Sequence, residues 1–182
     1  ALLVADMPFG SYGATVEQAF TSASRLMKLG AEAVKLEGSY LEEIAALTKA
    51  GIPVMGHLGF TPQSVNKFGG YRVQGKGDTI NDILLQSKLI QDAGAFGIVL
   101  ELMPSEAAHR ITQELTIPTI GIGAGINCDG EIQVIHDLLG LFPIKLRHTK
   151  RYCDGLEYFT QALKEYTREV RSGEFPGPEQ SA

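Results

Sequence analysis

Short aliphatic runs alternate with longer amphipathic segments along the chain. Six of these runs are almost continuously apolar, at residues 2–6, 33–37, 53–58, 97–102, 118–123 and 131–136. Continuous apolar runs are typical of parallel strands that helices cover, whereas half-exposed antiparallel strands alternate between apolar and polar residues. The pattern therefore predicts six parallel strands, of which the run at 131–136 is the weakest.

The segments between these runs have the spacing of amphipathic helices. Apolar residues at 16, 19, 20, 23, 26 and 27 form one stripe, and Gly30 follows at the position of a C-terminal cap. Ser39 and Glu42 have the spacing of a capping box, and Thr61-Pro62 resembles a helix start with proline at the first helical position. Further stripes predict helices that end near Gly94, around Ile111, and at about 154–172, before a loose tail at 173–182.

Repeated strand–helix units predict a parallel sheet with right-handed crossovers. Charged residues recur at the C-terminal ends of several strands: Asp6, Lys35 with Glu37, His57 and Glu101. In a (β/α)8 TIM-type barrel these ends meet at one mouth, whereas an open sheet concentrates them at one switch point. We therefore expect a single barrel domain over 1–182, with about six of the eight βα units in this chain and two missing before it.

Composition excludes several classes of protein. The chain is 44% hydrophobic and 20% charged, with a formal net charge of −5, as in an ordinary globular domain and unlike a nucleic-acid binder. No uninterrupted apolar span approaches the ~20 residues of a transmembrane helix. Cys128 and Cys153 lie far apart without metal-binding spacing, so we expect a cytoplasmic protein without a disulfide scaffold.

The carboxylates at the strand ends are candidate metal ligands. Lys35 and Glu37 point to the same side of their strand, and Asp6 ends another strand in the same way. Taken alone, such a pair is equally consistent with a buried structural ion pair. Two carboxylates that converge at a barrel mouth suit Mg²⁺, which leaves positions free for substrate and water, and no His/Cys cluster indicates zinc.

Two further residues are candidates for proton chemistry. Glu101 is flanked by apolar residues, so burial would suit it to the role of general base, although a role in orienting a ligand is the alternative. His57 shares a strand face with Met55, and a lone strand histidine is more often a satisfied polar residue than a catalyst. We include His57 as a weaker active-site candidate.

One long segment, GHLGFTPQSVNKFGGYRVQGKG at 56–77, resembles the central signature of the ketopantoate hydroxymethyltransferases. The match continues, in order, through ADMPF (5–9), VKLEG (34–38), VLELMP (99–104), IGIGAG (120–125), DGEIQVIHDLLGL (129–141), KRY (150–152) and SGEFPGPE (172–179). The resemblance thus covers essentially the whole chain, and the 56–77 signature is highly specific.

The resemblance implies a (β/α)8 barrel of the phosphoenolpyruvate/pyruvate superfamily. It implies transfer of a hydroxymethyl group from 5,10-methylenetetrahydrofolate to 3-methyl-2-oxobutanoate, which gives 2-dehydropantoate in pantothenate biosynthesis. It further implies Asp6 as a Mg²⁺ ligand and substrate contact, Lys35 as a substrate-binding residue, Glu37 as a second metal ligand and Glu101 as the proton acceptor. Members of the family are usually cytoplasmic homo-oligomers, often decamers.

The sequence departs from the family pattern in one respect. The family has a further strand, before the ADMPF equivalent, whose Asp-Ser pair supplies another metal ligand and substrate contacts, and this sequence has no counterpart of it. Two alternatives therefore stay open. One is a Mg²⁺-dependent C–C lyase or mutase of the same superfamily, which would not need folate, and the other is an inactive truncated fragment.

Overall fold

The computed structural model describes residues 1–181, which fall into two compact units, Ala1–Ile132 and the residues from Gln133 onward. The first unit contains all six described strands, and the second contains the long C-terminal helix. All five candidate site residues belong to the first unit. A single domain over 1–182 stays a prediction.

The first unit is built on one curled parallel sheet. Its strands are β1 Val4–Asp6, β2 Ala33–Lys35, β3 Val54–Gly59, β4 Gly97–Glu101, β5 Thr119–Ile122 and β6 Gly130–Glu131. Each strand pairs in parallel with the next one in sequence, in the order β1-β2-β3-β4-β5-β6. The parallel α/β fold predicted from the hydrophobic runs is confirmed.

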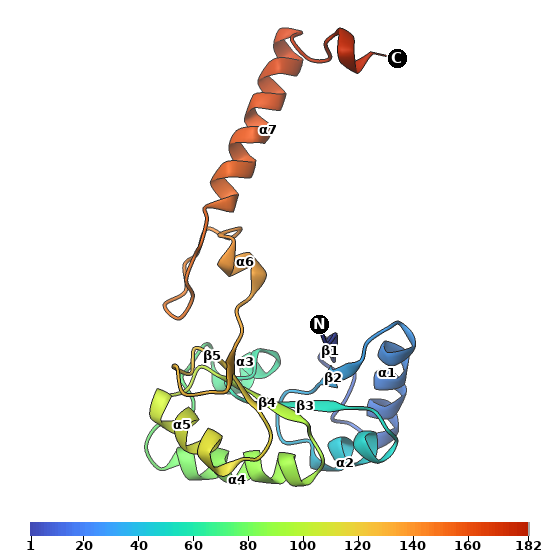
Figure 1. The fold of residues 1–182 in the computed structure, drawn as a ribbon, viewed down its shortest axis with the longest axis vertical. Coiled ribbons are helices and arrows are strands. Elements are labelled where there is room, and N and C mark those ends of the chain that lie inside the picture. The colour runs from blue at the N-terminus through green and yellow to red at the C-terminus, as the bar shows by residue number, and fades with distance from the viewer. Residues whose placement is uncertain (182) are drawn as a thin grey trace. The chain divides into compact units, whose positions relative to one another are not determined.

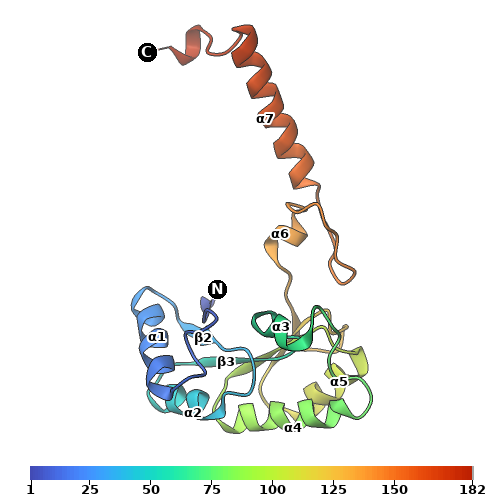
Figure 2. The same cartoon turned by 180° about the vertical axis from the view of Figure 1, so that it is seen from behind.

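Helices cover one side of this sheet. They are α1 Val16–Lys28, α2 Leu41–Lys49, α4 Thr79–Asp92 and α5 Ser105–Glu114. Figures 1 and 2, which view the molecule from opposite directions, both show these four helices along the same side of the strands. The 3₁₀ helix η1 Pro62–Ser64 and the short helix α3 Val65–Phe68 follow the C-terminal end of β3.

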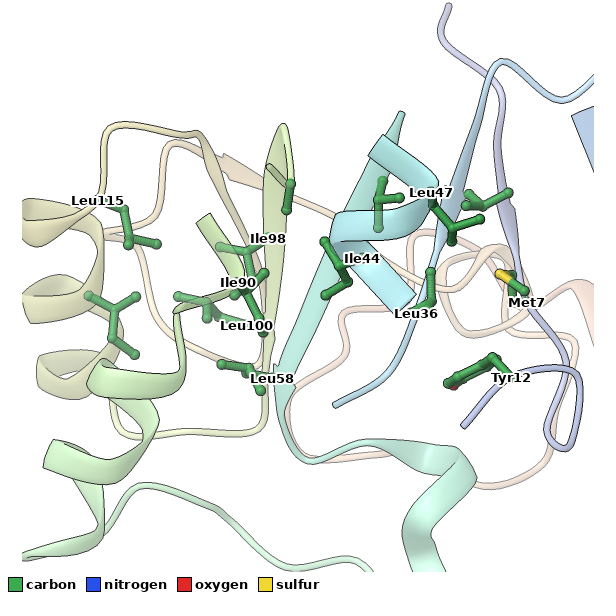
Figure 3. Close-up of a cluster of buried hydrophobic side chains, with 14 of the residues drawn as sticks. Met7, Tyr12, Leu36, Ile44, Leu47, Leu58, Ile90, Ile98, Leu100 and Leu115 are labelled. Carbon is green, nitrogen blue, oxygen red and sulfur yellow. The ribbon is translucent and has the colours of Figure 1, made fainter. Parts of the chain in front are cut away.

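The hydrophobic core lies between the sheet and these helices. Figure 3 shows Leu58, Ile98 and Leu100 of the strands together with Ile44 and Ile90 of the helices. Ile44, Ile90, Ile98 and Leu100 are fully buried, and burying one such side chain contributes about 1.5–3 kcal/mol. Because strand side chains alternate, the residues between these positions project from the opposite side of the sheet. That side carries the candidate site residues.

One helix cap was not predicted, one predicted helix start is confirmed in part, and another is wrong. Thr15 caps α1, since its Oγ1 accepts a hydrogen bond from the backbone N–H of Gln18 at 3.1 Å. Pro62 stands at the start of η1, as its spacing predicts, although that helix is a 3₁₀ helix. The capping box at Ser39 is absent, because the Ser39 hydroxyl instead donates to Oε1 of Gln86 at 2.9 Å and α2 begins without a side-chain cap.

The sixth strand is much shorter than predicted. β6 comprises only Gly130–Glu131, residues 132–134 are irregular, and the helix α6, Ile135–Leu138, begins within the last two residues of the apolar run at 131–136. The backbone N–H of Ile132 still donates to Gly121 O at 2.9 Å, which is the last bond to β5. A short apolar run does not distinguish a strand from a helical turn, and here it contains both.

The second unit contains α6 and the long helix α7, Gly155–Ser172, which confirms the helix predicted at about 154–172. The tail beyond it contains a 3₁₀ helix, η2 Pro178–Gln180. One face of α7 exposes apolar side chains, which are Leu156, Phe159, Leu163, Tyr166 and Val170. Within the described residues, every helix is too short or too polar to cross a membrane. Both cysteines, Cys128 and Cys153, are free.

The backbone adopts a left-handed conformation directly after the end of β4. Leu102 has a φ of 47°, which makes it the one non-glycine residue with positive φ in the described part of the chain. Hydrogen bonds hold this residue on both sides: its N–H donates to Ile122 O at 2.9 Å, and its carbonyl accepts from the N–H of Gln74 at 2.9 Å. The residue after Glu101 is therefore fixed in an unusual conformation.

Candidate active site

The five sequence-predicted site residues all lie at or near the C-terminal ends of adjacent strands. Asp6, Lys35 and Glu101 are the last residues of β1, β2 and β4, Glu37 follows β2 by two residues, and His57 lies in β3. Asp6 and Lys35 are direct register partners in the sheet. The predicted convergence of these side chains at one edge is therefore present.

Lys35 connects the acidic residues with the histidine. Its Nζ lies 2.9 Å from Oδ1 of Asp6, 3.2 Å from Nδ1 of His57 and 3.8 Å from Oε1 of Glu37. The Lys35 side chain is only 16% exposed and that of Glu37 only 4%. A buried ammonium group needs such partners, because an unpaired charge in a buried position is costly. The two carboxylates therefore share one cation.

His57 is placed between Lys35 and Glu101. A lysine ammonium only donates hydrogen bonds, so Nδ1 of His57 accepts and the proton of the neutral ring belongs on Nε2. This Nε2 lies 3.2 Å from Oε2 of Glu101, although their orientation does not meet the geometry of a hydrogen bond. The ring is 3% exposed and the Glu101 side chain 13%, so the pair is shielded from solvent.

Two residues that sequence reasoning missed, Tyr12 and Gln63, bind Glu37. The Tyr12 hydroxyl accepts from the backbone N–H of Glu37 at 3.1 Å and donates to Oε1 of Gln63 at 2.8 Å. The backbone N–H of Gln63 donates to Oε2 of Glu37 at 2.9 Å, and its Nε2 donates to Met7 O at 2.9 Å. Gln63 lies inside the 56–77 signature, which was the available signal, but nothing in the sequence singled out either residue.

Burial raises the pKa of the Tyr12 phenol to about 12. The negative charge of Glu37 acts in the same direction, whereas the hydrogen bond from the Glu37 backbone opposes the shift. The phenol therefore keeps its proton at neutral pH. It can donate to Gln63 throughout the range in which the protein would work.

The donor set fits Mg²⁺. Among residues 1–181, no group of three or more His, Cys, Asp or Glu side chains is arranged to hold a metal ion, so a site built from protein ligands alone is absent there. Asp6 and Glu37 nevertheless offer two carboxylates close to one cation, and the Asp6 side chain is 54% exposed. Mg²⁺ often uses only one or two carboxylates and takes its remaining ligands from water and substrate. Asp6 and Glu37 match this pattern of Mg²⁺ coordination, and they do not match the His/Cys ligand sets of zinc.

A cavity of about 600 Å³ opens beside Glu37. Its walls come from the loop after β2, the end of β3, the segment that follows β3, and α4, and they include Tyr40, Thr61, Phe68, Gln74 and Gln86. The volume falls within the range of small-molecule sites. The cavity is thus large enough for a small-molecule ligand next to Glu37, whereas Asp6, Lys35, His57 and Glu101 are not among its lining residues.

Two solved structures share the curled α/β fold of this chain. A 2,3-dimethylmalate lyase, described as a PEP mutase/isocitrate lyase superfamily member, matches 99% of this chain and 64% of its own, with a TM-score of 0.53 and 18% identity. A phosphoenolpyruvate phosphomutase from Streptomyces platensis matches 94% of this chain and 62% of its own, with a TM-score of 0.53 and 14% identity. At these identities the likeness shows the fold alone.

Sequence comparison identifies the family. Residues 1–178 match the family model described as ketopantoate hydroxymethyltransferase. Curated relatives from Saccharopolyspora erythraea and Rhodococcus jostii, both named 3-methyl-2-oxobutanoate hydroxymethyltransferase, are 51% and 50% identical over the whole of this chain. The chain belongs to the ketopantoate hydroxymethyltransferase family. It spans 63% and 64% of the length of these two relatives.

Proposed function

We propose that the protein transfers a hydroxymethyl group from 5,10-methylenetetrahydrofolate to 3-methyl-2-oxobutanoate, which gives 2-dehydropantoate for pantothenate biosynthesis. One observation carries this proposal beyond family membership. Asp6, Lys35, Glu37, His57 and Glu101 form a continuous set of contacts of 3.9 Å or less at one edge of the sheet. That set contains two candidate metal ligands, a cation for an anionic substrate and a candidate base.

The complete fold that we propose is a (β/α)8 barrel, to which this chain contributes about six βα units. The placement of helices on one side of the sheet and charged residues on the other supports it, because a barrel has helices outside and its site at the C-terminal mouth. An open doubly wound sheet would have helices on both faces.

Asp6 and Glu37 would hold Mg²⁺, and Lys35 would bind the carboxylate or the keto oxygen of the 2-oxo acid. When bound, the ion would act as a Lewis acid on the keto group, which makes the neighbouring C3–H more acidic. The exposed part of Asp6 allows it to contact both ion and substrate. Lys35 and Glu37 are shielded from solvent, so their electrostatic interactions with a bound ion or substrate would be stronger than in water.

Glu101 would remove the C3 proton of the 2-oxo acid. The C3 carbon would then form a bond to the methylene carbon of the folate as one of that carbon's two bonds to folate nitrogen breaks. Water would displace the second nitrogen, which supplies the hydroxyl oxygen and leaves tetrahydrofolate. The N–H of His57, which lies 3.2 Å from Glu101, would orient the carboxylate toward the substrate. Loss of a general base typically costs about 10²–10⁴ in rate.

The remaining family properties are also part of the proposal. The cavity beside Glu37, with Phe68 and Gln74 in its wall, has space for part of the folate. The exposed apolar face of α7 supports assembly into a homo-oligomer, since monomeric proteins rarely expose large apolar patches. We propose a cytoplasmic location, without nucleic-acid or membrane partners.

The lyase or mutase alternative is not favoured. Relatives at about 50% identity carry the name of the hydroxymethyltransferase, whereas the lyase and mutase structures share only the fold at 14–18% identity. A lyase or mutase would also turn over its substrate without a one-carbon donor. Activity that requires the folate separates the proposed enzyme from this alternative and from an inactive fragment.

Replacement of Glu101 by Gln in the full-length protein tests the proposal. We expect exchange of the C3 proton of 3-methyl-2-oxobutanoate with D₂O, followed by ¹H NMR with Mg²⁺ present, to slow at least about 100-fold. Mg²⁺ binding should persist, because Glu101 is not one of the proposed ligands. Glu106→Gln, on the exposed surface of α5, is the matched control and should exchange at the normal rate. Unchanged exchange in Glu101→Gln would remove Glu101 from the role of base.

A further inference from the structure

Tyr12 and Gln63 join three strand ends through four hydrogen bonds, and we name this set the Tyr12–Gln63 clamp. Two of its bonds end on Glu37, one at the backbone N–H and one at Oε2. A third ends on the carbonyl of Met7, the residue after Asp6, and the fourth joins the two clamp residues to each other. The clamp therefore connects the chain at both proposed metal ligands.

The clamp determines how the Glu37 carboxylate is oriented. Because the backbone N–H of Gln63 binds Oε2, Oε1 is the oxygen that faces Lys35 and His57, at 3.8 Å and 3.9 Å. The Glu37 side chain is 4% exposed, so water does not compete effectively for these contacts. A hydrogen bond to a buried charged group is worth about 1.5–3 kcal/mol, which is enough to favour one orientation strongly.

The clamp also limits the distance between the Asp6 and Glu37 segments. Gln63 comes from the segment after β3 and reaches both the Met7 carbonyl and the Glu37 carboxylate. Tyr12 lies in the loop after β1 and holds the Glu37 backbone. The loop after β1, the end of β2 and the segment after β3 are thus held together by side chains as well as by the sheet.

We propose that Tyr12 and Gln63 are positioning residues, which hold Glu37 and the backbone next to Asp6 at the spacing that a divalent cation requires. This inference rests on the proposed function, because it assumes that Asp6 and Glu37 bind the cation. Groups that orient metal ligands typically change metal affinity or activity 10–100-fold when they are replaced. Neither clamp residue needs to touch the ion or the substrate.

The test is the affinity of the full-length protein for Mn²⁺, used as a paramagnetic stand-in for Mg²⁺ and measured by electron paramagnetic resonance. Tyr12→Phe removes only the hydroxyl, and Gln63→Met removes the side-chain bonds while keeping the backbone N–H that binds Glu37. We expect each change to weaken Mn²⁺ binding about 10–100-fold. Tyr40→Phe is the matched control: its ring packs edge-on against Tyr12 at 5.1 Å, but its hydroxyl takes no part in the clamp. It should leave the affinity unchanged.

A double-mutant cycle distinguishes positioning from general support of the fold. If the two residues act as one unit, Tyr12→Phe/Gln63→Met should bind Mn²⁺ about as weakly as either single variant. The thermal unfolding of the cation-free variants, measured in parallel, corrects for any loss of folded protein. Normal affinity in the folded fraction of the single variants, or purely additive losses, would overturn the inference.

The unmutated protein and Glu37→Gln separate this inference from the proposed function. If the unmutated protein binds Mn²⁺ and Glu37→Gln does not, the metal site stands and the clamp variants decide the inference alone. If the unmutated protein does not bind Mn²⁺, the metal site and the clamp are both rejected.

Discussion

Among the individual residues of the site, Lys35 has a shielded charge that contacts three of the others. Its side chain is 16% exposed, and its ammonium lies within 4 Å of two carboxylates and one imidazole. The two carboxylates would repel each other without an intervening positive charge. Lys35 therefore has two roles that compete, since the charge that balances Asp6 and Glu37 is also the charge offered to an anionic substrate.

Replacement of Lys35 by Met should separate these two roles. We expect the KM for the 2-oxo acid to rise about 10–100-fold, because a hydrogen bond to a charged group contributes about 1.5–3 kcal/mol. Mn²⁺ binding should be retained or become tighter, since a competing positive charge is removed. Steady-state kinetics and Mn²⁺ titration measure the two effects.

Lys88→Met is the matched control for this prediction. Lys88 also pairs with a carboxylate, that of Glu114 at 2.7 Å, but on the exposed surface of the helices. Exposed pairs of this kind contribute little, so neither KM nor metal affinity should change. A normal KM in Lys35→Met would show that substrate binding does not depend on this charge.

The candidate residues on the strands could be predicted from the sequence, whereas the residues that orient them could not. Asp6, Lys35, Glu37 and Glu101 stand out because they interrupt or end apolar runs. Tyr12 and Gln63 lie in connecting segments, 51 residues apart, and their hydrogen bond exists only because the chain folds. Long-range contacts between loops have no local pattern, so the clamp was visible only in three dimensions.

At the scale of elements, β3 depends on a glycine for its contact with α4. A Cβ at Gly56 would lie 2.7 Å from Cγ2 of Ile90, closer than real carbon contacts allow. Ile90 is fully buried in the core, so it has little room to move. The adjacent residue in β3 is His57, which links packing at this point to the position of the site.

Gly56→Ala should destabilise the protein by about 1–3 kcal/mol through overpacking. Urea denaturation measures this loss as a lower midpoint with an unchanged slope. Gly97→Ala, where the nearest contact would be 3.3 Å from a backbone oxygen, should cost less and serves as the comparison.

Truncation of Ile90 should show whether contact with this side chain causes the destabilisation of Gly56→Ala. Ile90→Ala alone should cost about 2–5 kcal/mol, as is usual for a buried cavity. In the double variant, Gly56→Ala/Ile90→Ala, the new methyl group no longer meets Ile90. The combined loss should therefore be smaller than the sum of the two single losses. Simple additivity would show that the cost at Gly56 arises elsewhere.

Most elements followed from the hydrophobic spacing, and the exceptions have local causes. The stripe at 16–27 became α1, and its cap at Thr15 fits ordinary capping rules. Ser39 had the right spacing for a cap but a better partner in Gln86, which is distant in sequence. The run at 131–136 failed as a strand because only its first residue belongs to β6 and the rest precedes or enters α6.

At the scale of the whole molecule, α7 has an apolar face that the rest of its own unit does not cover fully. Phe159, Leu163 and Tyr166 are each more than half exposed. The opposite face carries charged residues, as in other amphipathic helices. A helix of this kind needs a partner surface, which the proposed homo-oligomer would supply.

Phe159→Glu should therefore reduce the size of the assembly. The new charge would be buried without a partner in a subunit contact, which is costly. Sedimentation velocity should detect a smaller species, while circular dichroism shows unchanged helix content. Gln161→Glu adds the same charge on another face of α7 and should leave the assembly intact. An unchanged sedimentation coefficient in Phe159→Glu would exclude this face from subunit contacts.

The alternation of strands and helices was sufficient to predict a parallel α/β fold, but the way in which the sheet curls was not. Apolar runs indicate that strands are covered, without indicating whether helices lie on one side or on both. The charged residues at several strand ends favoured the barrel, and the one-sided placement of α1, α2, α4 and α5 is consistent with it.

The left-handed backbone at Leu102 restricts which amino acids can follow Glu101. An L-residue in this region costs about 1–2 kcal/mol, and a β-branched one costs more because its side chain crowds the main chain. Glycine or asparagine would adopt the same turn easily, whereas valine or isoleucine of similar hydrophobicity would strain it. The backbone conformation at Leu102 should therefore limit which substitutions the residue next to the proposed base tolerates.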